Sequence, residues 1–229
     1  MNVHDKYREY IKGKRVVFVG ACPNLIGKET GKDIDNFDII VRSNGSFEIQ
    51  EKYKQDYGSR TDVLYCNVQY AREMHPLPVV RYVQNGIDFL CCKTLSHDKE
   101  EKYNKIIPTR TIKHVIQRVH KQVSGALMGV FIIEDILECK PKELHLTGID
   151  FFESKKKVFE HDNYQEYLDG YLPPKIREQG NVINKGKKED GHNQYTNTLY
   201  IYKLWEKGLV TMPDFIQDIM KGIINEKNK

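Results

Sequence analysis

The segment from Val16 to Thr30, VVFVGACPNLIGKET, has the residue types of a phosphate-binding loop. An apolar run ends at Gly20, and the pair Gly27-Lys28 follows it. A P-loop has the pattern G-x-x-x-x-G-K-[ST], because its backbone amides surround the phosphates and its hydroxyl holds magnesium. Here Cys22 stands at the first glycine of that pattern and Glu29 at the hydroxyl position. The segment is therefore not a P-loop.

The same segment also departs from the dinucleotide-binding pattern G-x-G-x-x-G. That pattern needs a second glycine beside the pyrophosphate and an acid after the next strand to bind a ribose. Cys22 replaces the glycine, and the next apolar run, FDIIVRSN, ends in Arg42 and Asn44 instead of an acid. The segment therefore predicts a ligand other than a dinucleotide.

Short apolar runs alternate with helical periodicity along the chain, which is typical of an α/β fold. Expected strands, rich in Val, Ile and Leu as doubly covered strands are, span residues 15–19, 38–41, 62–65, 87–91 and 143–146. Expected helices span residues 5–11, 47–55, 113–121, 125–137, 193–207 and 214–224. Helices between strands imply right-handed crossovers and a mostly parallel sheet.

In such a sheet ligands bind beside the carboxyl ends of the strands, so the polar residues there form the expected site. They are mainly small residues and amides: Gly20, Asn24, Asn44, Ser124, Gly125, Gly148 and Asp150. Such groups can hydrogen-bond a ribose, a phosphate and a carboxylate on a transferred group. They include no cluster of carboxylates for an octahedral metal ion, so we expect no metal.

The length and composition fit one soluble globular domain over residues 1–229, with 39% apolar and 30% charged residues. No run approaches the roughly 18 apolar residues of a membrane span. The polar N-terminus has no apolar region for secretion. We therefore expect a cytoplasmic or other soluble intracellular protein without a stable membrane anchor.

The net charge bears on the expected partners, and the cysteine content bears on the expected compartment. A net charge of +4 is modest, so nucleic acid is not an expected partner. The five cysteines lack metal-ligand spacing and are expected as buried or idle thiols in a reducing compartment. The sequence leaves open whether the chain forms a homo-oligomer.

The order and spacing of the polar residues resemble the sialyltransferases, which use CMP-activated sialic acid. The first long motif of the eukaryotic-type family is similar to Gly20, Asn24, Gly31, Ile34-Asp35, Asp38, Arg42, Asn44 and Gly58-Ser59-Arg60-Thr61. The short motif is similar to Ser124-Gly125 followed by Leu146-Thr147-Gly148. The segments LTGIDFF at 146–152 and GHNQYTNTLYIYKLWEKG at 191–208 are closer to the bacterial branch.

This resemblance implies a Rossmann-like, GT-A-variant domain with a mobile lid at about residues 183–191. It implies inverting, metal-independent transfer of sialic acid, or of a related acid sugar such as Kdo, from a CMP-sugar to a glycan hydroxyl, without a cofactor. The residues at the strand ends are then those that hold the donor. Asn44 is expected near its phosphate or sugar, and Gly148 and Asp150 beside the cytidine. Ser124 and Gly125 are expected to open a helix whose first amides face the phosphate or sugar carboxylate.

The resemblance also gives two histidines catalytic roles. His192 aligns with the family's base, which takes the proton of the acceptor hydroxyl, and an imidazole with a pKa near neutrality suits that task. His161 matches a second histidine, which donates to the departing phosphate.

Several positions depart from the family's pattern. Ala21 stands where an Asn usually reaches the donor phosphate, and Asn197 stands where the eukaryotic-type family has a Glu. Phe152 and Val158 align with a tyrosine pair of the bacterial branch. Candidate replacements at the leaving phosphate are Lys187, Lys188, His161 and Tyr164.

Three other interpretations remain at this stage. Asp33-Ile34-Asp35 spells the D-x-D of manganese-dependent glycosyltransferases, although it precedes most of the expected sheet. A CMP-binding module without turnover is favoured by Ala21, Phe152 and Val158, and disfavoured by His192. A basic nucleic-acid binder predicts a steep salt dependence and no preference for CMP.

Overall fold

The computed structural model describes residues 1–47, 49, 51–66, 79–151 and 193–227. Within them a single sheet has the strand order β5-β4-β3-β2-β1-β6, and every neighbouring pair is parallel. The strands are β1 (Arg15–Val19), β2 (Ile39–Ser43), β3 (Val63–Cys66), β4 (Phe89–Cys92), β5 (Thr109–Thr111) and β6 (Glu143–Thr147). The predicted α/β class with a parallel sheet is confirmed.

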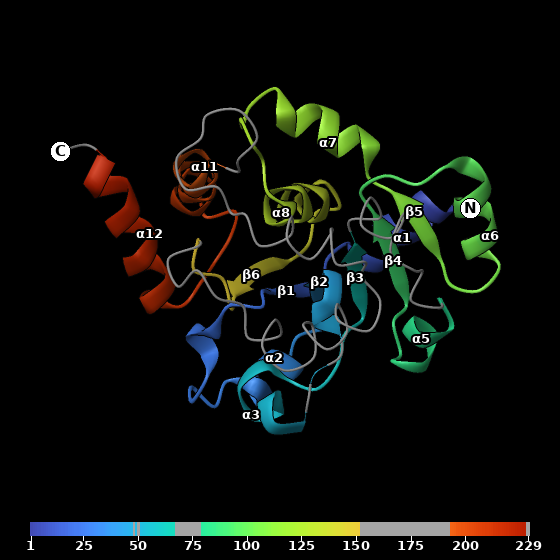
Figure 1. The fold of residues 1–229 in the computed structure, drawn as a ribbon, viewed down its shortest axis with the longest axis horizontal. Coiled ribbons are helices and arrows are strands. Elements are labelled where there is room, and N and C mark those ends of the chain that lie inside the picture. The colour runs from blue at the N-terminus through green and yellow to red at the C-terminus, as the bar shows by residue number, and fades with distance from the viewer. Residues whose placement is uncertain (48, 50, 67–78, 152–192, 228–229) are drawn as a thin grey trace, which may run out of the picture.

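The helices cover both faces of this sheet, as Figure 1 shows for α7, α8 and α11 on one side and α2 and α3 on the other. The helices that precede β5 along the chain are α1 (Val3–Ile11), α2 (Gly31–Asp35), α3 (Lys54–Tyr57), α5 (Val79–Gln84) and α6 (His97–Asn104). The helices that follow β5 are α7 (Lys113–His120), α8 (Met128–Glu138), α11 (Gln194–Glu206) and α12 (Asp214–Lys227).

Two helix predictions are corrected. Residues 47–55 do not form one helix: short 3₁₀ turns at Asn44–Phe47 and Glu51–Tyr53 precede the four-residue α3. The helix expected at 125–137 begins only at Met128, because Gly125 has φ +63° and lies in a turn. Helices α2, α5 and α6 and strand β5 were not predicted.

The core follows from the alternation of side chains along each strand. Val16 and Phe18 of β1 pack on one face with α1, α8, α11 and α12, whereas Val17 and Val19 pack on the other with Ile34 of α2 and Tyr57 of α3. Helix α8 is buried on most sides and contributes Val130, Phe131, Ile132, Ile133 and Ile136. Burying one such side chain contributes roughly 1.5–3 kcal/mol, so α8 is anchored against the sheet.

The outer edge of β6 is covered by the chain between α11 and α12. The amide of Leu146 donates to the carbonyl of Thr211 at 2.8 Å, and the amide of Thr211 donates to that of Leu144 at 3.0 Å. This pairing protects an otherwise open edge strand. None of the helices in the described ranges is both long and apolar enough to span a bilayer.

The strand order also fixes where a ligand can bind. From β1 the chain adds β2 to β5 on one side, and it then returns to place β6 on the other side of β1. The connections after β1 and β6 therefore diverge at their carboxyl ends, and such a switch point is where open parallel sheets bind their ligands.

Candidate functional site

At the switch point the backbones of two predicted site residues, Gly20 and Gly148, lie in direct contact. A Cβ on Gly20 would lie 2.3 Å from the carbonyl oxygen of Gly148, and one on Gly148 would lie 2.6 Å from that of Gly20. Gly148 also has φ +62°, which favours glycine. The two glycines thus allow the ends of β1 and β6 to approach as far as the backbones permit.

Beyond this contact, side chains join the two connections. The Cys22 thiol donates to Asp150 Oδ1 at 2.9 Å, and Asp150 is only 3% exposed. Asn24 Nδ2 donates to the carbonyl of Ile149 at 2.7 Å. Because that bond fixes the orientation of the amide, Asn24 Oδ1 faces away from Ile149, and this buried oxygen has no partner among the described residues. The structure therefore brings four predicted residues together: Gly20, Asn24, Gly148 and Asp150.

Hydrogen bonds to α3 fix the connection after β1. Asp56 is buried, and its two carboxylate oxygens each accept a backbone amide at 2.9 Å, one from Gly27 and one from Glu29. The hydroxyl of Tyr57 donates to the carbonyl of Cys22, and burial raises the pKa of Tyr57, so this hydroxyl keeps its proton. Asp56 thus takes the amides that a phosphate would take in a P-loop, which explains why the Gly27-Lys28 pair is not a phosphate loop here.

The start of α8 is held by α11. Asn197, which is buried, accepts from the amide of Leu127 at 2.9 Å and donates to the carbonyl of Gly125 at 3.0 Å. The hydroxyl of Thr196 donates to the carbonyl of Ser124 at 3.0 Å. Ser124 and Gly125 therefore form the turn before the helix and do not supply its first amides.

The first amides of α8 belong instead to Met128 and Gly129. Neither N–H has an acceptor among the described residues, because the helix ladder begins with Val130 donating to Leu127. An eleven-residue helix carries a partial positive charge at this end. Two helix-start amides at the carboxyl side of the sheet, without an acceptor in the described part of the chain, can bind a phosphate or a carboxylate.

Helix α11 also reaches the connection after β6. The side chain of its N-cap, Asn193, accepts from the amide of Thr196 at 3.0 Å, and Gln194 Nε2 donates to the carbonyl of Phe151 at 2.7 Å. The amino end of α11 is thus tied both to the turn before α8 and to the residues after Asp150.

Other predicted residues are placed differently. Asn44 lies exposed at the end of β2, with φ +53°, a conformation that Asn adopts more readily than most residues. The proposed base His192, the second histidine His161, the lid at 183–191, Phe152, Val158, Tyr164, Lys187 and Lys188 lie outside the described residues.

Within the described ranges, Asp33 and Asp35 have no third metal-binding side chain beside them. Asp35 lies in α2 and accepts from the amide and the hydroxyl of Ser59 at 2.9 Å each, whereas Asp33 is exposed. Across the described part of the chain, no three His, Cys, Asp or Glu side chains are grouped so that they could hold a metal ion.

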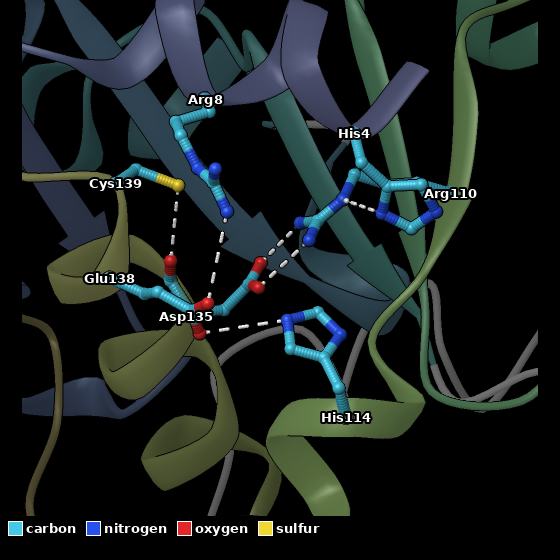
Figure 2. A pocket seen from close by; sticks show the side chains of 7 residues that line it. All are labelled: His4, Arg8, Arg110, His114, Asp135, Glu138 and Cys139. Atoms are coloured by element: carbon cyan, nitrogen blue, oxygen red, sulfur yellow. Dashed lines mark hydrogen bonds and ion pairs between the residues drawn. The ribbon is translucent and has the colours of Figure 1, made fainter. Parts of the chain in front are cut away.

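A buried group of charged side chains lies away from this edge of the sheet, between α1, β5, α7 and α8 (Figure 2). Arg110 and Asp135 form a buried two-point ion pair, with 3.0 Å between Nη2 and Oδ1. Tyr65 donates to Asp135 at 2.5 Å, and Tyr7 therefore donates to Tyr65 at 2.6 Å. We call these residues, with His4, the α1 network; none of the predicted site residues belongs to it.

A cavity of about 30 Å³ lies beside this network, lined among others by His4, His114 and Glu138. It has room for about one water molecule, far less than the roughly 300 Å³ of a small-molecule site. The α1 network is therefore a structural element.

Sequence reasoning missed three residues of the site: Cys22, Gln194 and Asn197. Cys22 follows the first predicted strand but was not counted among the donor-binding residues, and Asn197 was noted only as a departure from the family's pattern. The signal that could have found them was their place directly after β1 and in the first turns of α11. Their partners are 128 and 70 residues away along the chain, so no local pattern predicts the pairing.

The family model described as glycosyltransferase family 29 (sialyltransferase) matches residues 6–168, a range that ends before His192. No curated protein sequence matches the chain.

Solved structures of sialyltransferases are among those similar to the chain. A mammalian sialyltransferase has 14% sequence identity and a TM-score of 0.55, with 93% of this chain and 79% of that chain covered. A mammalian sialyltransferase in complex with Gal-β-1-3GalNAc-ortho-nitrophenol has 18% identity and a TM-score of 0.45, with 74% and 76% covered. The first shows that the two folds are alike.

Proposed function

The chain belongs to glycosyltransferase family 29, the sialyltransferase family, and from this premise we propose an inverting transfer of sialic acid, or of a related acid sugar such as Kdo, from a CMP-sugar to a glycan hydroxyl. The observation that carries the proposal is the family match, which includes the connections after β1, β2 and β6 and the start of α8. The groups at these connections can hydrogen-bond a nucleotide ester.

Asn24 and the glycine pair support a place for the donor at the switch point. Asn24 Oδ1 can only accept a hydrogen bond, so it suits a hydroxyl or amino group of the cytidine or sugar and not a phosphate oxygen. Gly20 and Gly148 let the connections after β1 and β6 lie close enough for groups from both to contact one ligand. Asp150 and Asn44 border the same edge and complete the proposed donor set.

The anionic part of the donor has a suitable counterpart at α8. Bond cleavage leaves negative charge on the phosphate of CMP, and fixed N–H dipoles that already point at that charge lower the barrier. We propose the amides of Met128 and Gly129 as such dipoles, and Asn197 fixes the turn before them. Ser124 and Gly125 then act by shaping this turn, and we propose no metal ion.

For the base we propose His192, with His161 as donor to the leaving phosphate. The imidazole would take the proton of the acceptor hydroxyl as that oxygen bonds to the anomeric carbon. The support for His192 comes from its neighbour: Asn193 caps α11, whose first turn bonds to Ser124 and Phe151 on either side of the proposed donor site.

The first test measures binding and turnover separately. Calorimetric titration with CMP, with UMP and AMP as controls, measures recognition, and release of CMP from CMP-sialic acid or CMP-Kdo with a galactoside acceptor measures transfer. We expect a preference for CMP and acceptor-dependent release. Binding of CMP without release from either sugar would identify a module without turnover, and equal affinity for all three nucleotides would contradict the proposed donor.

The second test concerns His192. General base catalysis contributes typically 10²–10⁴-fold, so His192→Ala should lower kcat by about that factor while CMP affinity is retained. His97→Ala, at an exposed position of α6, is the matched control and should leave kcat unchanged. Near-normal transfer by His192→Ala at neutral pH would exclude this residue as the base.

A further inference from the structure

We propose that Cys66 and Cys92 are an oxidisable dithiol, which closes to an intramolecular disulfide by exchange with a low-molecular-weight disulfide such as oxidised glutathione. The two residues end the neighbouring strands β3 and β4 and are directly paired in the parallel register. Their sulfur atoms lie 3.7 Å apart. The inference does not depend on the proposed transferase activity.

The backbone geometry suits such a bond. Neighbouring strands lie about 4.8 Å apart, which falls within the Cα separation of roughly 4.4–6.8 Å found for disulfides. Side chains of paired residues in parallel strands project from the same face, and both thiols belong to the same cluster, with Leu64 and Leu90. The sulfur atoms need to approach by about 1.7 Å to reach bonding distance, which small side-chain rotations supply.

The other cysteines are not placed for this reaction. Cys91 precedes Cys92 and projects from the opposite face, where Arg110 Nη1 lies 3.7 Å from its sulfur atom. Cys22 donates to Asp150, and Cys139 to the carbonyl of Asp135. No described His, Asp or Glu joins the pair to make a three-ligand metal site, so oxidation is the chemistry that two adjacent thiols offer.

Exposure determines the order of the steps. Cys66 is partly exposed and Cys92 is buried, so the Cys66 thiolate attacks the glutathione disulfide and releases one glutathione. The hydrogen bond that the Cys92 thiol makes to the Cys66 sulfur and burial both raise the pKa of Cys92. Once the Cys66 sulfur carries glutathione, that hydrogen bond is lost. The Cys92 sulfur then attacks the Cys66 sulfur and displaces the second glutathione. Two thiols are oxidised and one disulfide is reduced, and the two thiol protons pass to the released glutathiones.

The experiment treats the native protein with an excess of oxidised glutathione, removes it, and counts thiols after unfolding. We expect two fewer thiols than the five of the sequence and a mass lower by about 2 Da. Digestion without reductant should yield one linked peptide pair, containing Cys66 and Cys92, and this locates the bond without any variant.

Two variants sharpen the result. Cys66→Ser should retain all its remaining thiols, whereas Cys139→Ala, a buried control elsewhere in the core, should still lose two. The proposal is overturned if all five thiols of the native protein persist, if glutathione remains bound at Cys66, or if the linked peptides contain another pair.

Discussion

At the carboxyl edge of the sheet the described polar contacts are made by amides, hydroxyls, one thiol and the carboxylates of Asp56 and Asp150, without an ion pair. Beneath α1 they are made by a buried ion pair and two tyrosines. In the α1 network the charges of Arg110 and Asp135 are satisfied by each other, by Tyr65 and by His4. At the switch point Asn24 Oδ1 and the first amides of α8 are left without partners among the described residues.

The difference separates stability from recognition. Charges are costly to bury unless they are fully paired, so the α1 network has no capacity left for a ligand. Neutral dipoles cost less to leave open, and their spare donors and acceptors are what a nucleotide ester can use. Variants in either region test this separation.

The largest effect is expected for Asp135→Asn. This change leaves the guanidinium of Arg110 buried without a counter-ion, and breaking a buried pair in this way costs about 3–5 kcal/mol of unfolding free energy. Urea unfolding followed by circular dichroism measures the loss. CMP affinity of the folded protein should stay within about twofold of the wild type, since the network lies apart from the switch point.

Two controls accompany Asp135→Asn. Asp98→Asn, on the exposed surface of α6, should change neither quantity. The double variant Arg110→Met/Asp135→Leu should recover most of the stability, because an apolar pair of similar volume can replace a buried ion pair. A large loss of CMP affinity in the single variant would show that the two regions are coupled.

An intermediate effect is expected for Gly20→Ala. The added Cβ would overlap the carbonyl of Gly148, so the backbones must separate, and overpacking of this kind costs about 1–3 kcal/mol. Because the same shift displaces Asn24 and Asp150, CMP affinity should also fall by roughly tenfold, or about 1.4 kcal/mol. Thermal unfolding and calorimetric titration measure the two losses.

The matched control is Gly222→Ala in α12, where the added Cβ meets no atom within 4 Å. An alanine inside a helix should stabilise it by about 0.5–1 kcal/mol and leave CMP binding unchanged. Unaltered CMP affinity in Gly20→Ala would remove the glycine contact from the proposed site.

A smaller loss of stability is expected for Asn197→Ala. The change removes the acceptor of the Leu127 amide and the donor to Gly125, and an unsatisfied buried group costs about 1–3 kcal/mol, near the lower limit if water enters. Since these bonds hold the start of α8, whose amides are proposed to stabilise the charge on the leaving phosphate, we expect kcat to fall and the donor KM to rise. Asn197→Asp keeps the acceptor and should preserve more donor affinity than alanine. Equal KM values for the wild type and both variants would contradict this role.

The sequence predicted the sheet better than the site, and particular residues show why. The predicted strand at 15–19 coincides with β1 because VVFV is buried on both faces, and burial there depends only on local apolar content. Strand β5 was missed because its sequence is Thr-Arg-Thr, and the partner that allows Arg110 to be buried is Asp135 on α8. A charged residue such as Arg110 is typical of a loop, and only its partner Asp135, 25 residues further along the chain, allows it to be buried in a strand.

The start of α8 shows the same limit within the site. Ser124-Gly125 has the appearance of a helix start, but Gly125 has a positive φ and Asn197 supplies the hydrogen bond that caps the turn. The residues after β1, β2 and β6 were predicted because a parallel sheet gathers its strand ends at one edge. Which of their hydrogen-bonding groups stay open for a ligand depends on partners from α3 and α11, and these the sequence does not show.

The smallest expected effect is a loss of stability at mildly acid pH through His4. Arg110 Nε donates to His4 Nδ1 at 3.4 Å, so this nitrogen carries no proton in the folded state. Burial and then the charge of Arg110 lower the pKa of His4 below its usual 6.5; His114 acts in the same direction, and Glu100 and Asp135 oppose it. The folded state thus binds fewer protons than the unfolded chain. The stability that His4 contributes is therefore present above about pH 6.5 and is lost as the pH falls through the folded pKa.

Because His4 is partly exposed and hydrated, we expect this loss to be less than about 1 kcal/mol. Urea unfolding between pH 7.5 and pH 5.5, a range of about one unit on either side of the usual pKa, should show it. His4→Gln can still accept from Arg110 but does not titrate, so it should remove this part of the pH dependence. Burial also lowers the pKa of His145, so His145→Gln serves as the matched control and should leave the His4 contribution in place. If His4→Gln and the wild type lose stability in parallel, protonation of His4 does not loosen α1, and the α1 network holds the helix through Tyr7 instead.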